Sequence, residues 1–134
     1  MADFAFATDL VLHGNDLHDV GSVELAEVHL ASGQVTIGVT TPVLFNSFPA
    51  ADYRCAEYLL QFSQVSNFYQ TKLLVIHDGV DVGVSEYAQV GIGAEIPFTV
   101  EGSFSLGMLE LTLLCPTANV NPVVVKYSRV LFEV

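Results

Sequence analysis

Apolar and polar side chains alternate along most of this chain, which is the pattern of β-strands buried on one face. The clearest case lies near the C-terminus, where Val123, Val125 and Tyr127 share one face of an expected strand with Arg129. Lys126 and the other intervening residues take the opposite face. Further stretches are expected to be strands on the same grounds: "FAFATDLVL", "VELAEVHL", "VTIGV", "AEYLLQFSQV", "KLLVIH", "VGVSEYAQV", "IPFTVEG" and "LELTLLCP".

Segments rich in Gly, Asn, Asp, Ser and Pro separate these strands and predict turns. They read "HGND", "ASGQ", "HDGVD", "GIGAE", "GSFSLG" and "TANVNP". A strand with its turn recurs about every 8–14 residues, which is typical of antiparallel sandwiches and barrels. The sequence therefore predicts an all-β fold, either an antiparallel β-sandwich or a jelly-roll-like barrel.

One stretch, "GSVELAEVHLASG", fits a helix as well as a strand. Its Glu and Ala residues favour a helix, because both are good helix formers. The flanking glycines and the following "VTIGV" favour a hairpin, and we expect a strand here.

The chain has 134 residues, which fits a single domain covering 1–134. The stretch "TTPVLFNSFPAADY" carries two prolines and is expected to be a connection. Cys55 and Cys115 match no zinc-binding spacing and are expected to be buried free thiols.

Charge narrows the choice of partners. The net charge is −11, and the basic residues are Arg54, Lys72, Lys126 and Arg129 alone. Nucleic acids and anionic membranes repel such a chain, so neither is expected as a partner. Only 14% of residues are charged whereas 51% are hydrophobic, which suggests that part of the surface is buried against other subunits.

Neither a signal peptide nor a membrane span is expected. The stretch "MADFAFATDLVLHG" has no basic region before an apolar block. No run approaches the roughly 18 apolar residues that a membrane-spanning helix needs.

His77, Asp78, Asp81 and Glu86 lie close together in "KLLVIHDGVDVGVSEYAQV" and could form a turn, a metal site or a catalytic cluster. Asp-Gly between two strands is a strong hairpin signal, because Gly adopts positive φ and Asp satisfies backbone donors of the turn. The spacing does not match an EF-hand loop, and no nucleophile accompanies the acids. We expect a structural turn made by His77, Asp78 and Gly79.

Two other groups of residues have a chemical and a structural interpretation. His13, Asp16, His18 and Asp19 could bind a transition metal, but an Asn- and Asp-rich loop explains them equally well. Aromatic residues such as Tyr53 and Tyr69 could stack on a sugar ring, although core packing is the commoner use. Neither a "GxSxG" elbow nor a phosphate-binding loop is present. We therefore expect no enzyme, no cofactor and no metal site.

Three stretches after about Val43 form an ordered series. "FNSFPAADYRCAEYLLQFS" places a Tyr-Arg pair between a short loop and an apolar strand, and "FYQTKLLVIHDGVDVGVSEYAQV" passes through a His-Asp-Gly turn. "LELTLLCPTANVNPVVVKYSRVLFEV" crosses a Pro-containing loop into a valine-rich strand. This series resembles a β-rich module of virion structural proteins of tailed phages, especially cyanophages, over about two-thirds of the chain. Glu57 replaces an expected Lys, and "VDVGVSEY" is more apolar than the usual Thr-rich version.

The resemblance implies a non-enzymatic virion protein, made in the host cytoplasm and located on the capsid or tail. It also implies that residues 43–134 form the phage virion module and that residues 1–42 supply N-terminal strands or an arm. We expect a capsid decoration (cement) protein that stabilises the lattice of the major capsid protein, because the chain is short and carries one module. A tail, neck or fibre component, or a carbohydrate-binding module, is the alternative. Partners would be the major capsid protein or other virion proteins, with the chain itself a homo-oligomer such as a trimer. The expected contact residues are Tyr53, Arg54, Phe68 and Tyr69.

Overall fold

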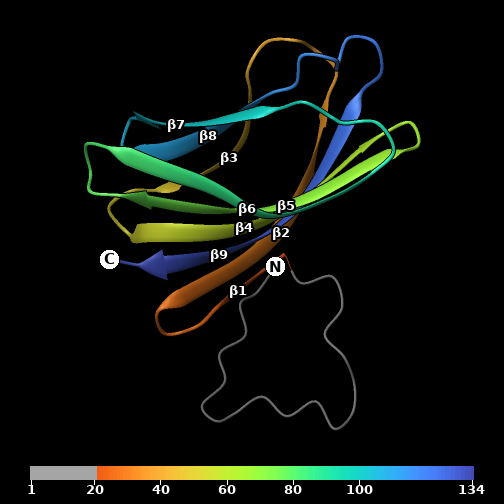
Figure 1. Ribbon diagram of the computed structural model, residues 1–134. Helices are drawn as coiled ribbons and strands as arrows, with labels where there is room; N and C mark the ends of the chain where they lie inside the picture. Colours follow the sequence, from red (N-terminus) through yellow and green to blue (C-terminus); the bar gives the residue numbers. More distant parts are fainter. Residues whose placement is uncertain (1–20) are drawn as a thin grey trace, which may run out of the picture.

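The computed structural model describes residues 21–134, and the regular elements in that range are all β-strands (Figure 1). The strands are β1 (Ser22–Glu24), β2 (Val28–Ile37), β3 (Val43–Pro49), β4 (Tyr53–Gln64), β5 (Asn67–His77), β6 (Val82–Ile92), β7 (Thr99–Ser105), β8 (Met108–Leu114) and β9 (Val123–Glu133). This part of the chain holds no helix with the length and hydropathy to cross a membrane.

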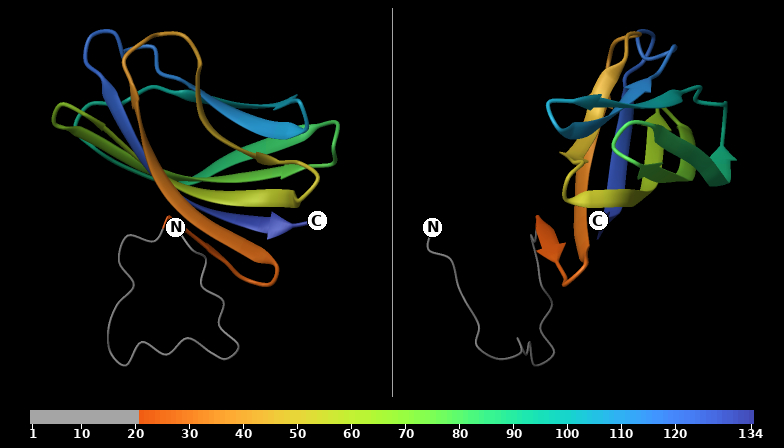
Figure 2. Two further views of the ribbon diagram at one scale, coloured as in Figure 1. Left: turned by 180° about the vertical axis from the view of Figure 1, so that it is seen from behind. Right: turned by 90° about the vertical axis from the view of Figure 1, so that its left-hand side faces the viewer.

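The strands form two sheets packed face to face. The larger sheet has six strands in the order β1-β2-β9-β4-β5-β6, and the smaller has three in the order β3-β8-β7. Every strand pair is antiparallel. Figure 1 shows the small sheet as one layer above the large one, and Figure 2 shows the two layers from the side. The predicted all-β, antiparallel class is confirmed, and the architecture is a sandwich.

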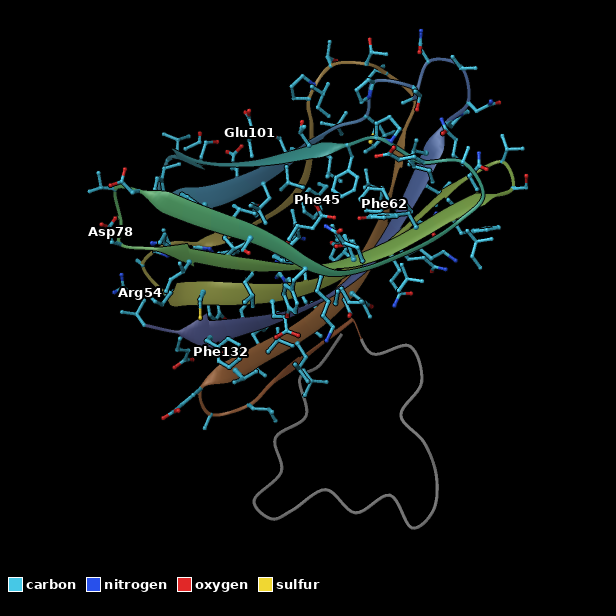
Figure 3. The ribbon with its side chains drawn as sticks, viewed as in Figure 1. Phe45, Arg54, Phe62, Asp78, Glu101 and Phe132 are labelled. Carbon is cyan, nitrogen blue, oxygen red and sulfur yellow. The ribbon has the colours of Figure 1, made fainter. Side chains whose placement is uncertain are left out.

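The core lies between the layers because one face of each long strand is apolar. In β9, Val123 and Val125 are fully buried, as the alternation predicts. Phe62 of β4 stacks on Phe98 with ring centroids 4.4 Å apart. Figure 3 shows Phe45 and Phe62 pointing into this space. The largest fully buried side chains are Tyr58, Phe48, Phe62, Ile37, Leu60, Leu73, Ile96, Leu109, Leu111, Leu113, Leu131 and Val75.

A polar network also joins the two sheets, and Asn46 of β3 is at its centre. The Tyr58 hydroxyl donates to Asn46 Oδ1 at 2.6 Å, and Arg129 Nη1 donates to the same oxygen at 2.5 Å. Asn46 Nδ2 donates to the Tyr127 hydroxyl at 2.8 Å. A register shift between Leu44 and Asn46 marks a β-bulge, which turns Asn46 toward the large sheet.

Four local predictions are wrong. The predicted turn "GSFSLG" begins inside β7, which continues to Ser105, and only Leu106 and Gly107 make the turn. The predicted strand "VELAEVHL" is split by residues 25–27, which connect β1 to β2. The predicted turn "ASGQ" lies inside β2, where Gly33 faces the Tyr127 ring and a Cβ would meet its hydroxyl oxygen at 2.5 Å. The connection predicted across 40–53 contains β3, whose Pro49 ends the strand at the edge of the small sheet.

The N-terminal part expected over residues 1–42 supplies β1 and β2, and β2 pairs with β9 along its whole length. The strand predicted at "FAFATDLVL" lies outside the described residues, and so does the turn "HGND".

Candidate interaction surface on the outer sheet face

The most distinctive surface is the face of the large sheet that points away from the small sheet, called here the outer face. Residues directly opposite each other in paired strands point to the same side. The strand registers therefore align side chains in rows that cross β2, β9, β4 and β5. Over these four strands the rows divide the outer face into a polar and an apolar half. On β6, the exposed apolar side chains of Val90 and Ile92 lie opposite Gln70 and Phe68, at the edge of the polar half.

The polar half is centred on one row of side chains, called here the polar row. Its members are Gln34, Lys126, Gln61 and Gln70, each directly opposite the next. Within the described chain, none of these four side chains makes a hydrogen bond or ion pair to the protein. The exposed ring of Phe68 lies one row further along β5, next to Gln70 on the same face.

The apolar half occupies the other end of the same strands. Its apolar members are Val23, Val28, Leu30, Cys55, Leu74, Ile76, Val130 and Phe132, and Glu57 lies among them, between Val130 and Leu74. Exposure is high for side chains that belong to a packed sheet: Ile76 is 58% exposed, Leu74 47% and Phe132 42%. Figure 3 shows Phe132 on the side of the large sheet away from the core.

A groove crosses the apolar half. It has a volume of about 470 Å³, and Cys55, Glu57, Leu74, Ile76 and Phe132 line it together with residues 83–85 of β6. Gly83 lies opposite Ile76 and carries no side chain that would fill the groove. The groove is therefore a shaped apolar depression at the β5–β6 side of the face.

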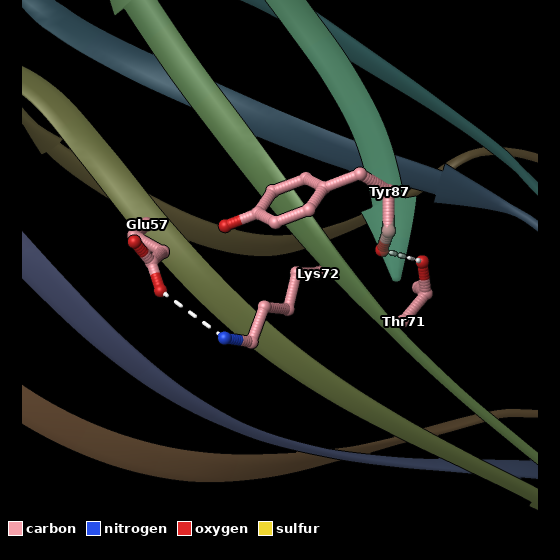
Figure 4. A network of polar contacts seen from close by, with 4 residues as sticks. All are labelled: Glu57, Thr71, Lys72 and Tyr87. Atoms are coloured by element: carbon pink, nitrogen blue, oxygen red, sulfur yellow. Dashed lines mark hydrogen bonds and ion pairs between the residues drawn. The ribbon is translucent and has the colours of Figure 1, made fainter. Parts of the chain in front are cut away.

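A charged pair lies where the two halves meet (Figure 4): Lys72 is in the row between them, and Glu57 is in the adjacent row of the apolar half. Lys72 Nζ lies 3.8 Å from Glu57 Oε1 and 6.0 Å from the centre of the Tyr87 ring. The Thr71 hydroxyl donates to the Tyr87 carbonyl at 3.2 Å, at a register shift between β5 and β6. An ion pair this exposed contributes little to stability, about 0–1 kcal/mol. Its main effect is to neutralise the single lysine that faces the apolar half.

Acidic residues gather at the strand ends next to the apolar half, called here the acidic end. They are Glu24, Glu27, Asp52, Asp78, Asp81 and Glu133. Backbone hydrogen bonds tie these segments together: the Glu133 amide donates to Glu27 O and the Val134 amide to Asp52 O, each at 3.0 Å. Burial, followed by the charges of Glu24, Glu133 and Asp52, raises the pKa of the Tyr53 hydroxyl.

The residues 78–81 connect β5 to β6, and Asp78 organises this turn. Its Oδ1 accepts the amide hydrogens of Val80 and Asp81, each at 2.8 Å, and Gly79 has a φ of 97°. These backbone hydrogen bonds lower the pKa of the Asp78 carboxyl. Oδ1 of Asp78 therefore holds the backbone of the turn.

His77 is buried beneath the same turn. Its Nδ1 accepts the Gly79 amide hydrogen at 3.1 Å, so Nε2 carries the proton and donates to Tyr53 O at 2.6 Å. Phe48 and Phe104 flank the ring. Both nitrogens of His77 are thus satisfied within the fold.

Glu86 lies elsewhere, where it accepts a hydrogen bond from the Tyr69 hydroxyl at 2.8 Å. Within residues 21–134, no group of three or more His, Cys, Asp and Glu residues is placed to hold a metal ion. His13, Asp16, His18 and Asp19 lie outside the described residues. Cys55 and Cys115 are free thiols, but only Cys115 is buried, so the expectation of a buried thiol is wrong for Cys55, which is partly exposed on the outer face. Burial raises the pKa of Cys115.

The four expected contact residues lie in different environments. Tyr69 packs its ring against Phe62 and Phe98, and burial with the Glu86 hydrogen bond raises its pKa to about 12. Tyr53 packs on Phe48, and Arg54 Nη1 donates to the His77 carbonyl at 3.2 Å. Phe68, at 44% exposure, is the one whose side chain stands open on the outer face.

Sequence reasoning did not identify the apolar half. Its residues come from five strands distant in the sequence, and only the register brings Val28, Phe132, Cys55 and Ile76 into one row. A signal was present in the four consecutive apolar residues of "LLVIH", residues 73–76. They make both faces of β5 apolar, whereas a strand buried on one side needs only one apolar face.

No protein-family model and no curated protein matches this sequence. Among solved structures, the tailspike protein of Acinetobacter baumannii phage AM24 is similar over 80% of this chain and 26% of its own, with 7% identity and a TM-score of 0.49. The tailspike protein of Acinetobacter phage vB_ApiP_P1 is similar over 95% of this chain and 24% of its own, with 15% identity and a TM-score of 0.37. The chain thus spans about a quarter of either tailspike. Scores at this level identify no shared site, so the function has to be inferred from the surfaces of this chain.

Proposed function

We propose that this chain is a non-enzymatic structural component of a phage virion and that it binds a neighbouring virion protein through the apolar half. The observation that carries the proposal is the exposed apolar half with its groove. Large contiguous apolar patches on a soluble domain mark interaction sites, because exposing them to water is unfavourable. Ordinary sandwich sheets instead present polar residues on the face opposite the core.

The free energy gained by covering the apolar half is sufficient for a contact between subunits. Fully burying a Leu, Ile or Phe side chain contributes about 1.5–3 kcal/mol. Leu74, Ile76 and Phe132 are about half exposed, so covering each of them contributes roughly 1 kcal/mol. The whole apolar half then supplies several kcal/mol to one contact, and repetition around a particle adds avidity.

The resemblance to phage virion modules supports the assignment to a particle. Within the particle we propose the tail or its fibres, where this chain would contact a neighbouring tail protein through the apolar half. Capsid decoration is the second location. A homo-oligomer remains part of the proposal and is measured by light scattering on the purified chain.

The test uses purified chain and the separated tail and capsid fractions of the encoding phage. Wild-type chain, Ile76→Asp and Leu106→Asp are each mixed with both fractions, and bound chain is quantified after sedimentation. Leu106 is the matched control, because it is fully exposed in the β7–β8 turn, far from the outer face. We expect wild type and Leu106→Asp to bind tails stoichiometrically, and Ile76→Asp to lose at least about tenfold in affinity.

Each outcome has a distinct meaning. Binding to capsids instead of tails, with the same loss in Ile76→Asp, would assign the chain to capsid decoration. Wild-type chain that binds neither fraction, or Ile76→Asp that binds like wild type, would overturn the proposal.

A second candidate function is glycan binding, favoured by the polar row. Unpaired amides of Gln34, Gln61 and Gln70 offer donors and acceptors to sugar hydroxyls, and the exposed Phe68 ring offers a stacking surface. Shallow grooves of about 150 and 190 Å³ flank Gln61 and Gln70.

Tyr53 and Tyr69, two of the aromatic residues considered for sugar stacking, point into the sandwich instead. A glycan array with wild type and Phe68→Ala tests this candidate. Binding that is lost in Phe68→Ala but kept in Ile76→Asp would establish it, and no binding to any glycan would exclude it.

A further inference from the structure

The apolar half and the acidic end adjoin each other, and together they describe the partner. The row Val28–Phe132–Cys55–Ile76 is the last row of the outer face before the turns that carry the acids. A segment that covers this row also reaches the strand ends that carry the acidic end, although Glu24 and Glu133 alternate with the outer-face residues Val23 and Phe132 and so point to the other side of the sheet. The partner therefore has to complement two features at once: the apolar half, and the negative charge of the acidic end.

Within the described residues, few positive charges lie near the carboxylates of the acidic end. Arg54 is the one basic residue at the acidic end, and its guanidinium donates to the His77 carbonyl. Lys72 on the neighbouring border is paired with Glu57. Lys126 belongs to the polar row at the other half of the face. No carboxylate of the acidic end forms an ion pair within the described residues.

We infer that the segment which covers the apolar half is a basic one, with Lys or Arg residues flanking the apolar side chains that enter the groove. The inference rests on the proposed function, because it names the chemistry of the partner for that same surface. Complementary charge would steer the encounter and would fix which end of the partner meets the acidic end. A second copy of this chain fits less well, since each copy carries a net charge of −11.

The test uses two fluorescent synthetic peptides with one apolar core, Val-Ile-Leu-Val-Ile. One is flanked by Arg residues and the other by Glu residues. Fluorescence anisotropy gives the affinity of each for wild-type chain at about 0.05 M and 0.5 M NaCl, which brackets strong and weak screening.

Two triple variants separate local from overall charge. Glu27→Gln/Asp52→Asn/Asp81→Asn removes three charges from the acidic end, and these three side chains make no hydrogen bond within the described chain. Glu95→Gln/Glu101→Gln/Glu110→Gln removes three charges elsewhere. Glu101 and Glu110 lie on the small sheet, and Figure 3 shows Glu101 on the opposite layer from Phe132.

We expect the Arg-flanked peptide to bind wild-type chain at least about tenfold more tightly than the Glu-flanked peptide at low salt. High salt should remove most of that difference, and so should the triple variant at Glu27, Asp52 and Asp81. The triple variant at Glu95, Glu101 and Glu110 should keep the difference. Equal affinity for both peptides, including no binding of either, would overturn the inference. An equal loss in both triple variants would overturn it too, because net charge alone would then explain the preference.

The two proposals fail separately. If Ile76→Asp loses tail binding but the peptides show no charge preference, the inference fails and the proposed function stands. If Ile76→Asp binds tails like wild type, the proposed function fails whatever the peptides show.

Discussion

Replacing Asn46 by alanine should destabilise the sandwich strongly, because the Asn46 side chain joins the two sheets. Asn46 binds three side chains of the large sheet through one amide group: Tyr58, Tyr127 and Arg129. Tyr58 is fully buried, so neither water nor a neighbouring group replaces the lost acceptor without rearrangement.

The magnitude follows from the groups left without partners. A buried polar group that loses its partner costs about 1–3 kcal/mol. The hydroxyls of Tyr58 and Tyr127 both lose their bond to Asn46, while Arg129 keeps a bond to Ser47 O at 3.0 Å. We therefore expect Asn46→Ala to lower the free energy of unfolding by about 3–5 kcal/mol, a large share of the stability of a small domain.

The assay is urea unfolding followed by tyrosine fluorescence, with two comparison variants. Asn46→Asp keeps an acceptor for Tyr58 and places a charge beside Arg129, so it should recover at least about 2 kcal/mol of the loss. Asn121→Ala, at an exposed loop position, should change stability by no more than about 0.5 kcal/mol. A loss below about 1 kcal/mol in Asn46→Ala, or no recovery in Asn46→Asp, would refute the view that this network joins the sheets.

Asp78, Glu86 and Val65 each give one further prediction. Hydrogen bonds hold the pKa of Asp78 below its usual value, so its carboxylate stabilises the fold above about pH 4. That contribution is lost as the pH falls through the folded-state pKa. Acid unfolding curves of wild type and Asp78→Asn should therefore differ above this range and converge below it. Glu86→Gln should lower the pKa of Tyr69 from about 12, but the pKa should stay above 10 because the burial of the hydroxyl remains. Ultraviolet titration at 295 nm measures this pKa, and an unchanged value would show that the Glu86 contact is not made in solution. Val65 has a φ of 57° in the β4–β5 turn, so Val65→Asn should raise the free energy of unfolding by about 1 kcal/mol in urea unfolding, and a loss would contradict the turn geometry.

The features predicted correctly from the sequence are those set by neighbouring residues. The alternation of Val123, Val125 and Tyr127 fixes which side of β9 is buried, because successive side chains of a strand point to opposite faces. The connection at residues 78–81 has the hairpin position that Asp-Gly indicates.

The features that sequence reasoning missed depend on contacts between distant segments. Gly33 looks like a turn residue, yet it is kept in a strand by the Tyr127 ring from β9. The Pro-containing stretch around Asn46 looks like a linker, yet it pairs with β8. The apolar half exists only because β2, β9, β4 and β5 are held in one register, which no local pattern specifies.

The central claim is that the apolar half is covered by another protein in the particle, and Cys55 allows a direct measurement. Cys55 lines the groove and is partly exposed, whereas Cys115 is fully buried with a raised pKa. The measurement is the rate of iodoacetamide alkylation of each cysteine, by mass spectrometry, in the free chain and in intact phage particles. We predict that Cys55 reacts readily in the free chain and at least about tenfold more slowly in particles, with Cys115 unreactive in both. Equal Cys55 rates in the two states, or the absence of the chain from particles, would contradict the claim.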